Sequence, residues 1–545
     1  MDPRVVAHRR QVGPKMNPDI VKGVAVTQMD GVKAYVDHVW RCAARSFPPG
    51  LEYIRGEICT PEEEFREIAD APKNGARGKR AGRGKLELAR SDVFLMKYKL
   101  AWEGVELPPK YLFLPFVGQA GLMHLRGPRY CVSPVLADLA FSPAKGNGIF
   151  THFTRDKITI NRSSSTYICD DRAVSTFVVW SAIHTLANDQ SKRRGVTSTL
   201  AHYLFAKYGL QETFSKFANT QIVVGHEEID DITYPKEDWV ICRSVGISPS
   251  PYKKKHYEPS RVRIAIPRFS FYNPDGKPNV LIDGLVAGFF YVTDHFPEQI
   301  RPEFCESDRF WRHLLGYVIV EGEENGGKIQ QQIDAHMSSL DEYVDELVIE
   351  TFKSVGIDPQ DIYEFFVFMI QYIHEFLLTV DPANMYGKKL TVLRYVMLDI
   401  VIAIFRFTYD IRSSGKKGLN SQNIRQALGR RLNRDLIFNL ASHHGEVQII
   451  SSSSDCALLK LTSTVVLQER ATVQRKRRGK GTLSDPSKVV HISIVECGSA
   501  MNLPKSEPTG RTKCNPHVRT TPEGLIIRDE SRREYFDEVQ KVLQR

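Results

Sequence analysis

Short apolar runs rich in β-branched and aromatic residues fill residues 91–177. In one of them, Ile158 and Ile160 alternate with polar neighbours, which is the period of a half-buried strand. Turns that contain glycine and proline separate the runs. The pattern predicts a strand-rich region here, preceded by a helix over residues 32–45.

Apolar residues recur at helical spacing between residues 331 and 440, and the two most apolar runs there are 365–380 and 392–407. A helix that spans a membrane needs about 20 mostly uncharged apolar residues. Both runs are interrupted by polar or charged residues, namely Gln371, His374, Glu375, Arg394, Asp399 and Arg406. We therefore expect two buried helices of a large core.

A chain of 545 residues is too long for a single hydrophobic core, so about two to four domains are expected. Helical and strand-like spacing are mixed between residues 178 and 330, and the final hundred residues are polar and loop-like. We predict an α+β, multidomain fold with four regions: strand-rich 1–177, mixed α/β 178–330, helical 331–440 and loop-rich 441–545.

Charge changes this picture, because 74 Lys and Arg outnumber 64 Asp and Glu and give a net charge of +10. A basic excess suits a polyanion such as nucleic acid, since cations that meet phosphates release condensed counterions. The simpler interpretation is an ordinary basic protein. The start of the chain has no apolar run, so no signal peptide is predicted.

The nine cysteines are dispersed and include no CxxC pair. A zinc ribbon needs closely spaced ligand pairs, and a secreted scaffold usually has a dense, even set of cysteines. Reduced structural thiols are therefore expected.

Basic clusters supply the candidate binding residues. The densest is RKRRGK at residues 475–480, where arginine could grip phosphate with two parallel hydrogen bonds. A second candidate is the turn-rich stretch 508–515, and a glycine-rich basic run lies at 72–85. Each could equally be a solvated loop or turn. The candidate nucleic-acid-binding residues are Arg475, Lys476, Arg477, Arg478, Lys480, Gly510, Arg511, Lys513 and Asn515.

Motifs for catalysis are missing from the sequence. No carboxylate triplet such as DxDxD is present to hold the two Mg²⁺ ions of nucleotidyl transfer, and no phosphate-binding loop ends in GK[ST]. The segment HEEIDD at 226–231 offers several metal-ligand types but lacks the HExxH spacing. We expect no catalytic residue and no metal ligand in this chain alone.

Three stretches resemble the first half of the β-type, second-largest subunit of multisubunit DNA-directed RNA polymerases. In the first, 114–135, the matching positions are Pro115, Gly121, Gly127 and Arg129. The second, 365–410, is similar to the family's turn of Tyr/Phe-Gly-Lys/Asn-Lys/Arg and an apolar residue between two apolar helices. That turn is here Tyr386-Gly387-Lys388-Lys389-Leu390, and its spacing permits a helical hairpin.

The third stretch, 449–524, resembles the family's fork-like region, which ends in a Gly-Arg turn that corresponds to Gly510 and Arg511. The family's Thr-Pro-Glu-Gly motif follows that turn closely. In this chain Thr521-Pro522-Glu523-Gly524 comes later. Either an insertion separates the two motifs or the second match is accidental.

The resemblance implies the N-terminal part of a split β subunit, as in large-genome bacteriophages. Region 1–177 would be protrusion-like, 178–330 a lobe-like insertion, 331–440 a return to the protrusion and 441–545 fork-like. The chain would line the channel for downstream DNA and the RNA–DNA hybrid. The complete nucleotidyltransferase would need a β C-terminal fragment and β′-type chains, one of which would hold the catalytic Mg²⁺.

The same resemblance places the polymerase in the cytoplasm of an infected host cell and leaves open whether it is packaged in the virion. Two other hypotheses remain at this point. One is a basic viral structural or packaging protein that binds nucleic acid without enzymatic activity. The other is a metal-dependent nuclease built around His226, Glu227, Glu228 and Asp230.

Overall fold

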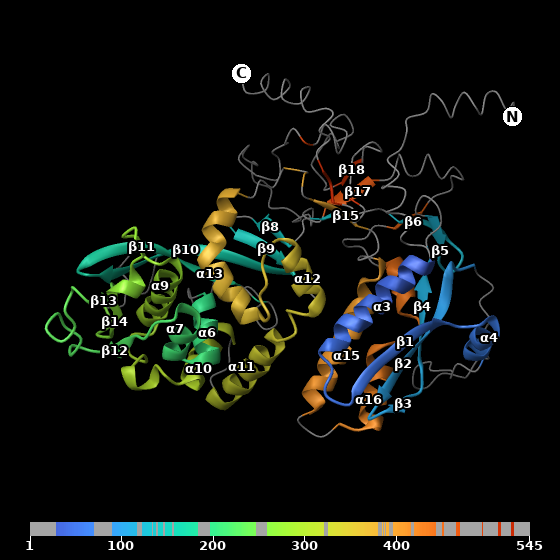
Figure 1. Cartoon of the computed structure of the whole chain (residues 1–545), viewed down its shortest axis with the longest axis horizontal. Helices are drawn as coiled ribbons and strands as arrows, with labels where there is room; N and C mark the ends of the chain where they lie inside the picture. Colours follow the sequence, from blue (N-terminus) through green and yellow to red (C-terminus); the bar gives the residue numbers. More distant parts are fainter. Residues whose placement is uncertain are drawn as a thin grey trace, which may run out of the picture. The chain divides into compact units, whose positions relative to one another are not determined.

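The computed structural model divides the chain into two compact units (Figure 1). Unit 1 comprises residues 1–139, 345–347 and 381–545, and unit 2 comprises residues 140–344 and 348–380. The chain therefore leaves unit 1, builds unit 2 and returns to unit 1. The structure describes residues 29–69, 90–116, 122–132, 135–137, 140–144, 148–154, 157–181, 183, 197–246, 259–320, 325–379, 384, 386, 388–391, 396–415, 419–442, 449–451, 465–468, 493, 511–513, 521 and 525–527.

Unit 1 is built on an antiparallel sheet in which the long strand β2 pairs with β1 on one side and with β3 and β4 on the other. Helices and short strands complete it. Its described elements are α3 (Met29–Arg45), β1 (Leu51–Ile58), α4 (Pro61–Ala69), β2 (Val93–Trp102), β3 (Val105–Glu106), β4 (Lys110–Pro115), β5 (Leu122–His124), β6 (Arg129–Val132), β7 (Val135–Ala137), β15 (Lys389–Thr391), α15 (Leu398–Gly415), α16 (Ser421–Arg431), the 3₁₀ helix η3 (Leu436–Ser442), β16 (Ile449–Ser451), β17 (Val465–Gln468) and β18 (Arg511–Lys513).

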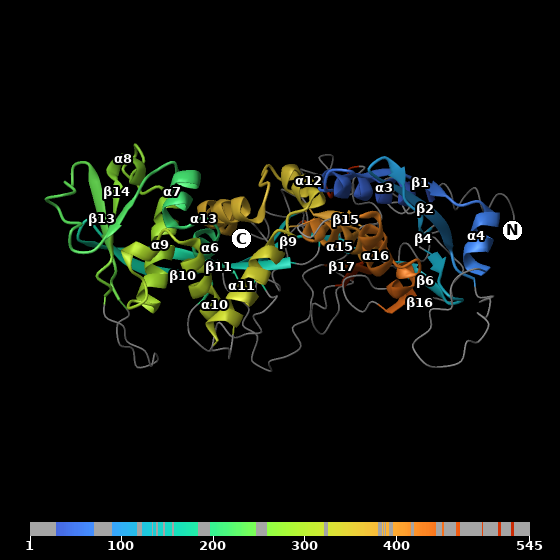
Figure 2. The same cartoon turned by 90° about the horizontal axis from the view of Figure 1, so that it is seen from below.

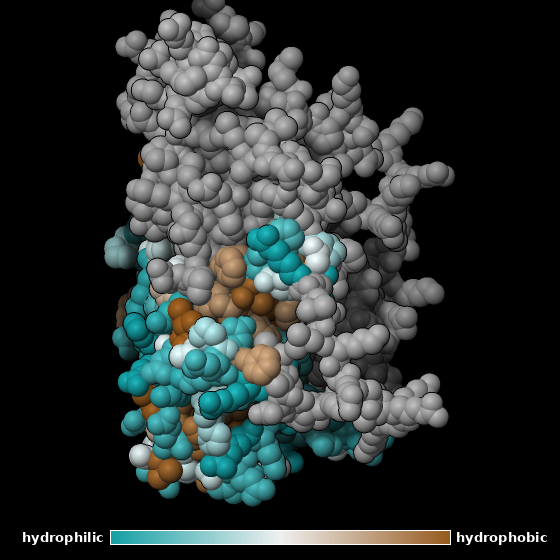
Figure 3. Space-filling view, turned by 90° about the vertical axis from the view of Figure 1, so that its right-hand side faces the viewer, coloured by the Kyte–Doolittle hydropathy of each residue, from teal (hydrophilic) through white to brown (hydrophobic). Residues whose placement is uncertain are grey.

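Packing of α3 and α15 against this sheet forms the core of unit 1. The indole of Trp40 is fully buried, stacks on Tyr53 and meets Tyr98 from β2 and Phe407 from α15. Aromatic burial of this size contributes much of a core's stability. Figure 3 looks onto one side of unit 1, where apolar residues gather among hydrophilic ones. The large apolar side chains that unit 1 exposes among its described residues are Ile54, Ile58, Phe65, Val105 and Ile527.

Unit 2 is built around a seven-stranded antiparallel sheet in the order β12-β14-β13-β10-β9-β8, with β11 paired to β10. Helices α9 and α6 lie against β10 and β11 (Figures 1 and 2). Its described elements are β8 (Phe141–Ala144), β9 (Gly148–His152), β10 (Lys157–Cys169), β11 (Arg172–Ser181), α6 (Leu200–Tyr208), α7 (Leu210–Ala218), β12 (Val223–Gly225), β13 (Trp239–Arg243), β14 (Arg263–Pro267), α8 (Arg268–Phe271), α9 (Val280–His295), the 3₁₀ helix η2 (Pro302–Phe304), α10 (Asp308–Ile319), α11 (Gly326–Leu340), α12 (Glu346–Ser354) and α13 (Ile362–Thr379).

Helix α9 lies in the hydrophobic core of unit 2. Helix α9 has apolar residues on most of its circumference and is buried along most of its length. Gly288 lets α9 approach α6 closely, because a side-chain carbon at that position would overlap Ala201. Such a helix can exist only inside a large core, which explains its unusual hydrophobicity.

The α+β, multidomain prediction is confirmed. Strands at 157–169 and helices at 29–45 and 421–431 also follow the sequence pattern. The chain passes from unit 1 to unit 2 at 139/140 and returns at 380/381, and residues 345–347 also belong to unit 1.

The two apolar runs of the predicted hairpin, now α13 and α15, do not share one large core. Phe365, Phe366 and Met369 of α13 are buried in the core of unit 2, whereas Ile404 and Phe407 of α15 are buried in the core of unit 1. Apolar spacing shows that a helix is buried, but it does not show in which core. Among the described residues, no helix has the length and hydrophobicity required of a membrane span.

Helices α15 and α16 are joined by a buried carboxylate. Asp410 accepts hydrogen bonds from Arg431 at 2.7 and 2.9 Å and from Arg430 at 2.6 Å. Burial of this carboxyl raises its pKa, but the hydrogen bonds from Arg431 and Arg430 outweigh that effect and hold the pKa of Asp410 below its usual value.

We predict that Asp410→Asn destabilises unit 1 by roughly 2–3 kcal/mol, because it leaves two guanidinium groups without their anion. The loss of stability should be largest above about pH 4, the pKa of this carboxyl in the unfolded chain. A carboxyl whose pKa is lowered by folding stabilises the folded state above that pH, and this stabilisation disappears as the pH falls. Hydrogen exchange of the α15 and α16 amides measures the effect. Asp435→Asn, at an exposed ion pair with Arg434, is the control and should change exchange little.

Candidate nucleic-acid interface

One small sheet brings together four segments that lie far apart in the sequence. Its strand order is β15-β7-β17-β18. Leu390 of β15 pairs with Leu136 of β7, and β7 pairs in parallel with β17 at Leu467–Val135. Leu467 in turn pairs with Arg511 of β18. Val135, the last residue of the first family-like stretch, thus lies beside Thr391 of the second stretch and Leu467 of the third.

A second sheet repeats the connection. Strand β6 pairs with β5 through Tyr130–Met123 and with β16 through Cys131–Ile450. The first family-like stretch contributes β5 and β6, and the third contributes β16. The third stretch is therefore attached to the first at two places.

The end of the third stretch lies against the Tyr-Gly-Lys-Lys turn. Ile526 donates its backbone N–H to the carbonyl of Lys388 at 2.8 Å, and Leu525 forms a bridge with Lys389. Thr521 donates its backbone N–H to the carbonyl of Leu525 at 2.8 Å. The side chain of Lys388 is buried.

Of the predicted binding residues, Arg511 and Lys513 lie on β18, opposite Leu467 and Val465 of β17. The others lie outside the described residues: Arg475, Lys476, Arg477, Arg478, Lys480, Gly510 and Asn515. The structure therefore places two of the nine on the sheet that joins the three stretches.

The sequence pattern did not single out a basic turn between β5 and β6. Arg126 and Gly127 have φ of 51° and 98°, the left-handed conformation of a tight hairpin turn. The exposed guanidinium of Arg126 lies 4.6 Å from the ring centre of Phe438, and that of Arg434 lies 5.6 Å from Phe113. The two rings contact each other edge to face. Gly127-Pro128 indicated the turn, but only packing reveals the stacked arginines.

This arrangement can present positive charge with fixed geometry. Arg90, whose side chain is 70% exposed, pairs with the nearly buried Asp92. His124 donates its backbone N–H to the same carboxylate at 2.7 Å. Arginines held by stacking lose less conformational entropy when they meet a phosphate. The turn is therefore a reasonable contact for a polyanion.

Residues 5–526 match the model of a protein family described as non-virion RNA polymerase subunit. This chain belongs to that family. Comparison with curated proteins found no match. Membership makes the protein a subunit of an RNA polymerase and implies a complex with other subunits. It does not by itself say which subunit this is.

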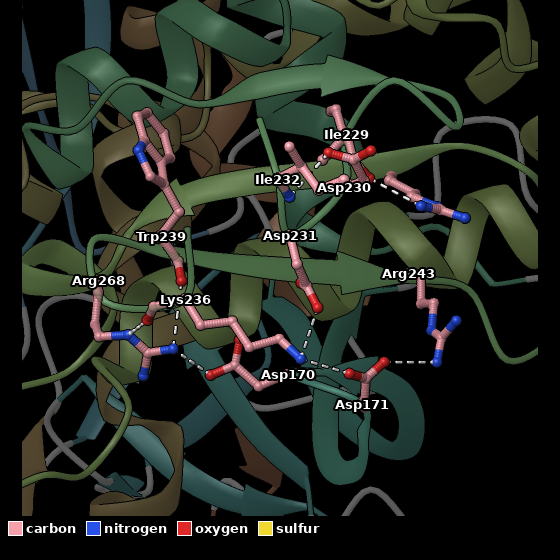
Figure 4. Close-up of polar contacts among 11 residues, drawn as sticks. Asp170, Asp171, Ile229, Asp230, Asp231, Ile232, Lys236, Trp239, Arg243 and Arg268 are labelled. Atoms are coloured by element: carbon pink, nitrogen blue, oxygen red, sulfur yellow. Dashed lines mark hydrogen bonds and ion pairs between the residues drawn. The ribbon is translucent and has the colours of Figure 1, made fainter. Parts of the chain in front are cut away.

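Within this polymerase subunit, the HEEIDD segment forms an ordered turn (Figure 4). Three of its four carboxylates are engaged by nearby groups of the same loop. Glu228 accepts the backbone N–H of His226 at 2.8 Å, and Asp230 accepts that of Thr233 at 2.8 Å. Asp231 pairs with Lys236 at 2.9 Å.

A metal-dependent nuclease would need at least three ligand atoms of this segment around one point. Among the described residues, no group of three ligand-capable side chains includes His226, Glu227, Glu228 or Asp230. The hydrogen bonds above explain these acidic residues as turn-forming groups. The nuclease hypothesis therefore has no geometric support.

A buried carboxyl in unit 2 holds two chain segments together. Asp294 of α9 accepts hydrogen bonds from the hydroxyl of Ser244 and from the backbone N–H of Gly246, the latter at 3.2 Å. Ser244 also accepts the backbone N–H of Ser260 at 3.1 Å. Asp294 thus links both sides of residues 247–258, which lie outside the described residues. Burial raises the pKa of Asp294 to about 6, although both hydrogen bonds oppose the shift.

We predict that Asp294→Asn makes the stability of unit 2 less dependent on pH. A carboxyl with a raised pKa stabilises the fold at low pH, and that contribution is lost as pH rises from about 4 to about 6. Over this pH range the free energy of unfolding of the wild type should fall by about 2–3 kcal/mol relative to that of the variant. The asparagine keeps an acceptor for Ser244 and Gly246. Urea unfolding at several pH values measures the difference. Asp275→Asn, in an exposed turn, should follow the wild type, and parallel curves for Asp294→Asn would contradict the assignment.

Proposed function

We propose that this subunit is the N-terminal part of a split β-type subunit of a DNA-directed RNA polymerase. The observation that carries the proposal is the convergence of the three family-like stretches. The second and third stretches meet the end of the first, Val135, in the sheet β15-β7-β17-β18, and β16 of the third stretch pairs with β6 of the first. An accidental likeness in three separate stretches gives no reason for them to pair.

The path of the chain supports the same assignment. A β-type N-terminal half is expected to contain a protrusion-like part interrupted by a lobe-like insertion. Unit 2 interrupts unit 1 between residues 139 and 381, apart from the short segment 345–347. We therefore assign unit 1 to the protrusion-like and fork-like parts and unit 2 to the lobe-like part.

The position of Thr521 and Leu525 beside Lys388–Lys389 favours a true match for the Thr-Pro-Glu-Gly motif. Residues 512–520 would then contain an insertion relative to the family. An accidental match gives no reason for Leu525 and Ile526, the residues that follow the motif, to pair with Lys389 and Lys388.

In this role the chain contributes shape and positive charge, and other chains contribute the chemistry. We expect a β C-terminal fragment and β′-type chains as partners, with the catalytic Mg²⁺ held by a β′-type chain. Basic side chains of this subunit would track phosphates of the DNA template and the RNA–DNA hybrid without reading bases. The complex would add nucleotides in the cytoplasm of an infected host cell.

We predict that the tagged chain, expressed with the other polymerase subunits, copurifies with a β C-terminal fragment and β′-type chains in fixed proportion. The isolated chain should not synthesise RNA, because it lacks the metal-binding carboxylates. Mass spectrometry of the purified complex and a transcription assay check both points. RNA synthesis by the isolated chain would contradict the proposal. So would a purified polymerase in which a different chain supplies the N-terminal part of the β subunit.

We further predict that Arg477→Ala with Arg478→Ala weakens the elongation complex in a salt-dependent manner and leaves assembly intact. Each lost phosphate contact should lower the slope of log affinity against log salt by about one. Dissociation of stalled complexes at increasing salt measures this slope. Arg172→Ala with Arg309→Ala, at exposed positions of unit 2, is the matched control for loss of two charges. If stalled complexes of the Arg477/Arg478 variant dissociate at the same salt concentration as the wild type, these two arginines do not contact nucleic acid.

A further inference from the structure

Two cysteines face each other across the sheet of unit 2. Cys169, the last residue of β10, is the register partner of Cys242 in β13. The next pair along, Asp170 and Ile241, is joined by a backbone hydrogen bond from Asp170 N–H to the Ile241 carbonyl at 3.1 Å. Hydrogen-bonded and non-hydrogen-bonded pairs alternate along an antiparallel ladder. Cys169 and Cys242 therefore form a non-hydrogen-bonded pair.

That position has the geometry of a cross-strand disulfide. Alpha carbons of a non-hydrogen-bonded pair lie about 4.5 Å apart. Cystines span alpha-carbon distances of about 4.4–6.8 Å. Among the strand pairs that the structure describes, this is the one place where two cysteines are register partners. The spacing of such a pair therefore falls within the range that a cystine spans.

The two thiols already interact with each other. The hydrogen bond from Cys242 lowers the pKa of Cys169, and the hydroxyl of Tyr272, 3.9 Å from the Cys169 sulfur, acts in the same direction. Burial raises the pKa of Cys242. Cys169 is thus the thiol that ionises first and the better nucleophile, with Cys242 beside it as the second thiol.

Access to this pair is controlled by the charged network of Figure 4. Asp170 and Asp171, which follow Cys169, form the two-residue turn between β10 and β11 and have φ of 47° and 63°. Asp171 pairs with Lys236 at 2.8 Å and with Arg243, the neighbour of Cys242, at 2.9 Å. The exposed side chains of these pairs make them weak and sensitive to salt.

Arg268 closes the other side of the turn. It pairs with Asp170 at 2.6 Å, and its guanidinium lies 5.4 Å from the ring centre of Tyr272. Tyr272 is the residue whose hydroxyl reaches the Cys169 sulfur. Because Cys169 ends its strand, local opening of the turn exposes this thiol without unfolding the sheet.

We propose that Cys169 and Cys242 form an oxidisable dithiol that a peroxide converts to a cross-strand disulfide, with the turn at Asp170–Asp171 as its latch. The Cys169 thiolate attacks one peroxide oxygen, which breaks the O–O bond and leaves a sulfenic acid and hydroxide. The Cys242 sulfur then attacks the sulfenic sulfur, loses its proton and displaces water. The two thiols lose two protons and two electrons in total, and hydrogen peroxide is reduced to two waters.

The bond joins β10 to β13 across the middle of the sheet. A cross-link between residues so far apart in sequence removes conformational entropy from the unfolded chain. Oxidation should therefore stiffen unit 2, and reduction should restore the original state. This inference depends on the geometry of unit 2 alone and is independent of the β-type assignment.

The test treats the purified full-length subunit with hydrogen peroxide, blocks the remaining thiols and identifies linked peptides by mass spectrometry. We expect a Cys169–Cys242 cystine as the main product, and a rise of roughly 5 °C in the melting temperature that a reductant reverses. Cys169→Ser and Cys242→Ser should each abolish both effects. If a variant fails to fold, the melting temperatures of the oxidised wild type with and without reductant still provide the test. Absence of this cystine, or cystines distributed at random among the cysteines, would overturn the proposal.

A separate measurement tests whether the turn at Asp170–Asp171 limits oxidation of the cysteine pair. Asp171→Asn removes the ion pairs to Lys236 and Arg243 but keeps a residue that adopts the left-handed conformation readily. Oxidation of this variant should be about five-fold faster than in the wild type. Asp275→Asn, at an exposed turn elsewhere in unit 2, is the matched control and should oxidise at the wild-type rate. Equal rates for Asp171→Asn and the wild type would show that the turn does not limit access.

Discussion

Backbone pairing through β7 is the interaction on which the rest of unit 1 depends. This strand has only three residues, yet it pairs with β15 on one side and β17 on the other. Strands this short are not stable alone, and their amides and carbonyls need partners once they are buried. The sheet therefore forms only when segments from the beginning, middle and end of the chain come together. Any surface built by these segments exists only in the folded protein.

The same pairing explains how unit 2 can be inserted without disturbing unit 1. The chain leaves unit 1 shortly after β7 and returns shortly before β15, and these two strands are direct neighbours. A long excursion between adjacent points costs little additional closure entropy, provided that the inserted segment has its own core. Unit 2 meets that condition, since α9, α6 and α13 bury their apolar residues within it.

Several charged residues in the described part of this subunit hold turns and helix pairs together. Asp410 joins two helices, Asp294 joins two chain segments, and the acidic residues around Asp171 are neutralised by lysine and arginine. None of these carboxylates converges on a metal site among the described residues. In the part of the chain that the structure describes, these carboxylates therefore act in holding the fold together.

The sequence by itself determined the features that depend on neighbouring residues. Alternation at Ile158 and Ile160 identified a strand, helical spacing identified α3 and α16, and the Tyr386–Leu390 turn indicated the polymerase family. Tertiary structure alone decided which core receives α13, which strands lie beside β7, and that Cys169 faces Cys242. The reason is physical: periodicity records which side of an element is buried, whereas its partner is chosen by hydrogen bonds and packing between segments remote in the chain.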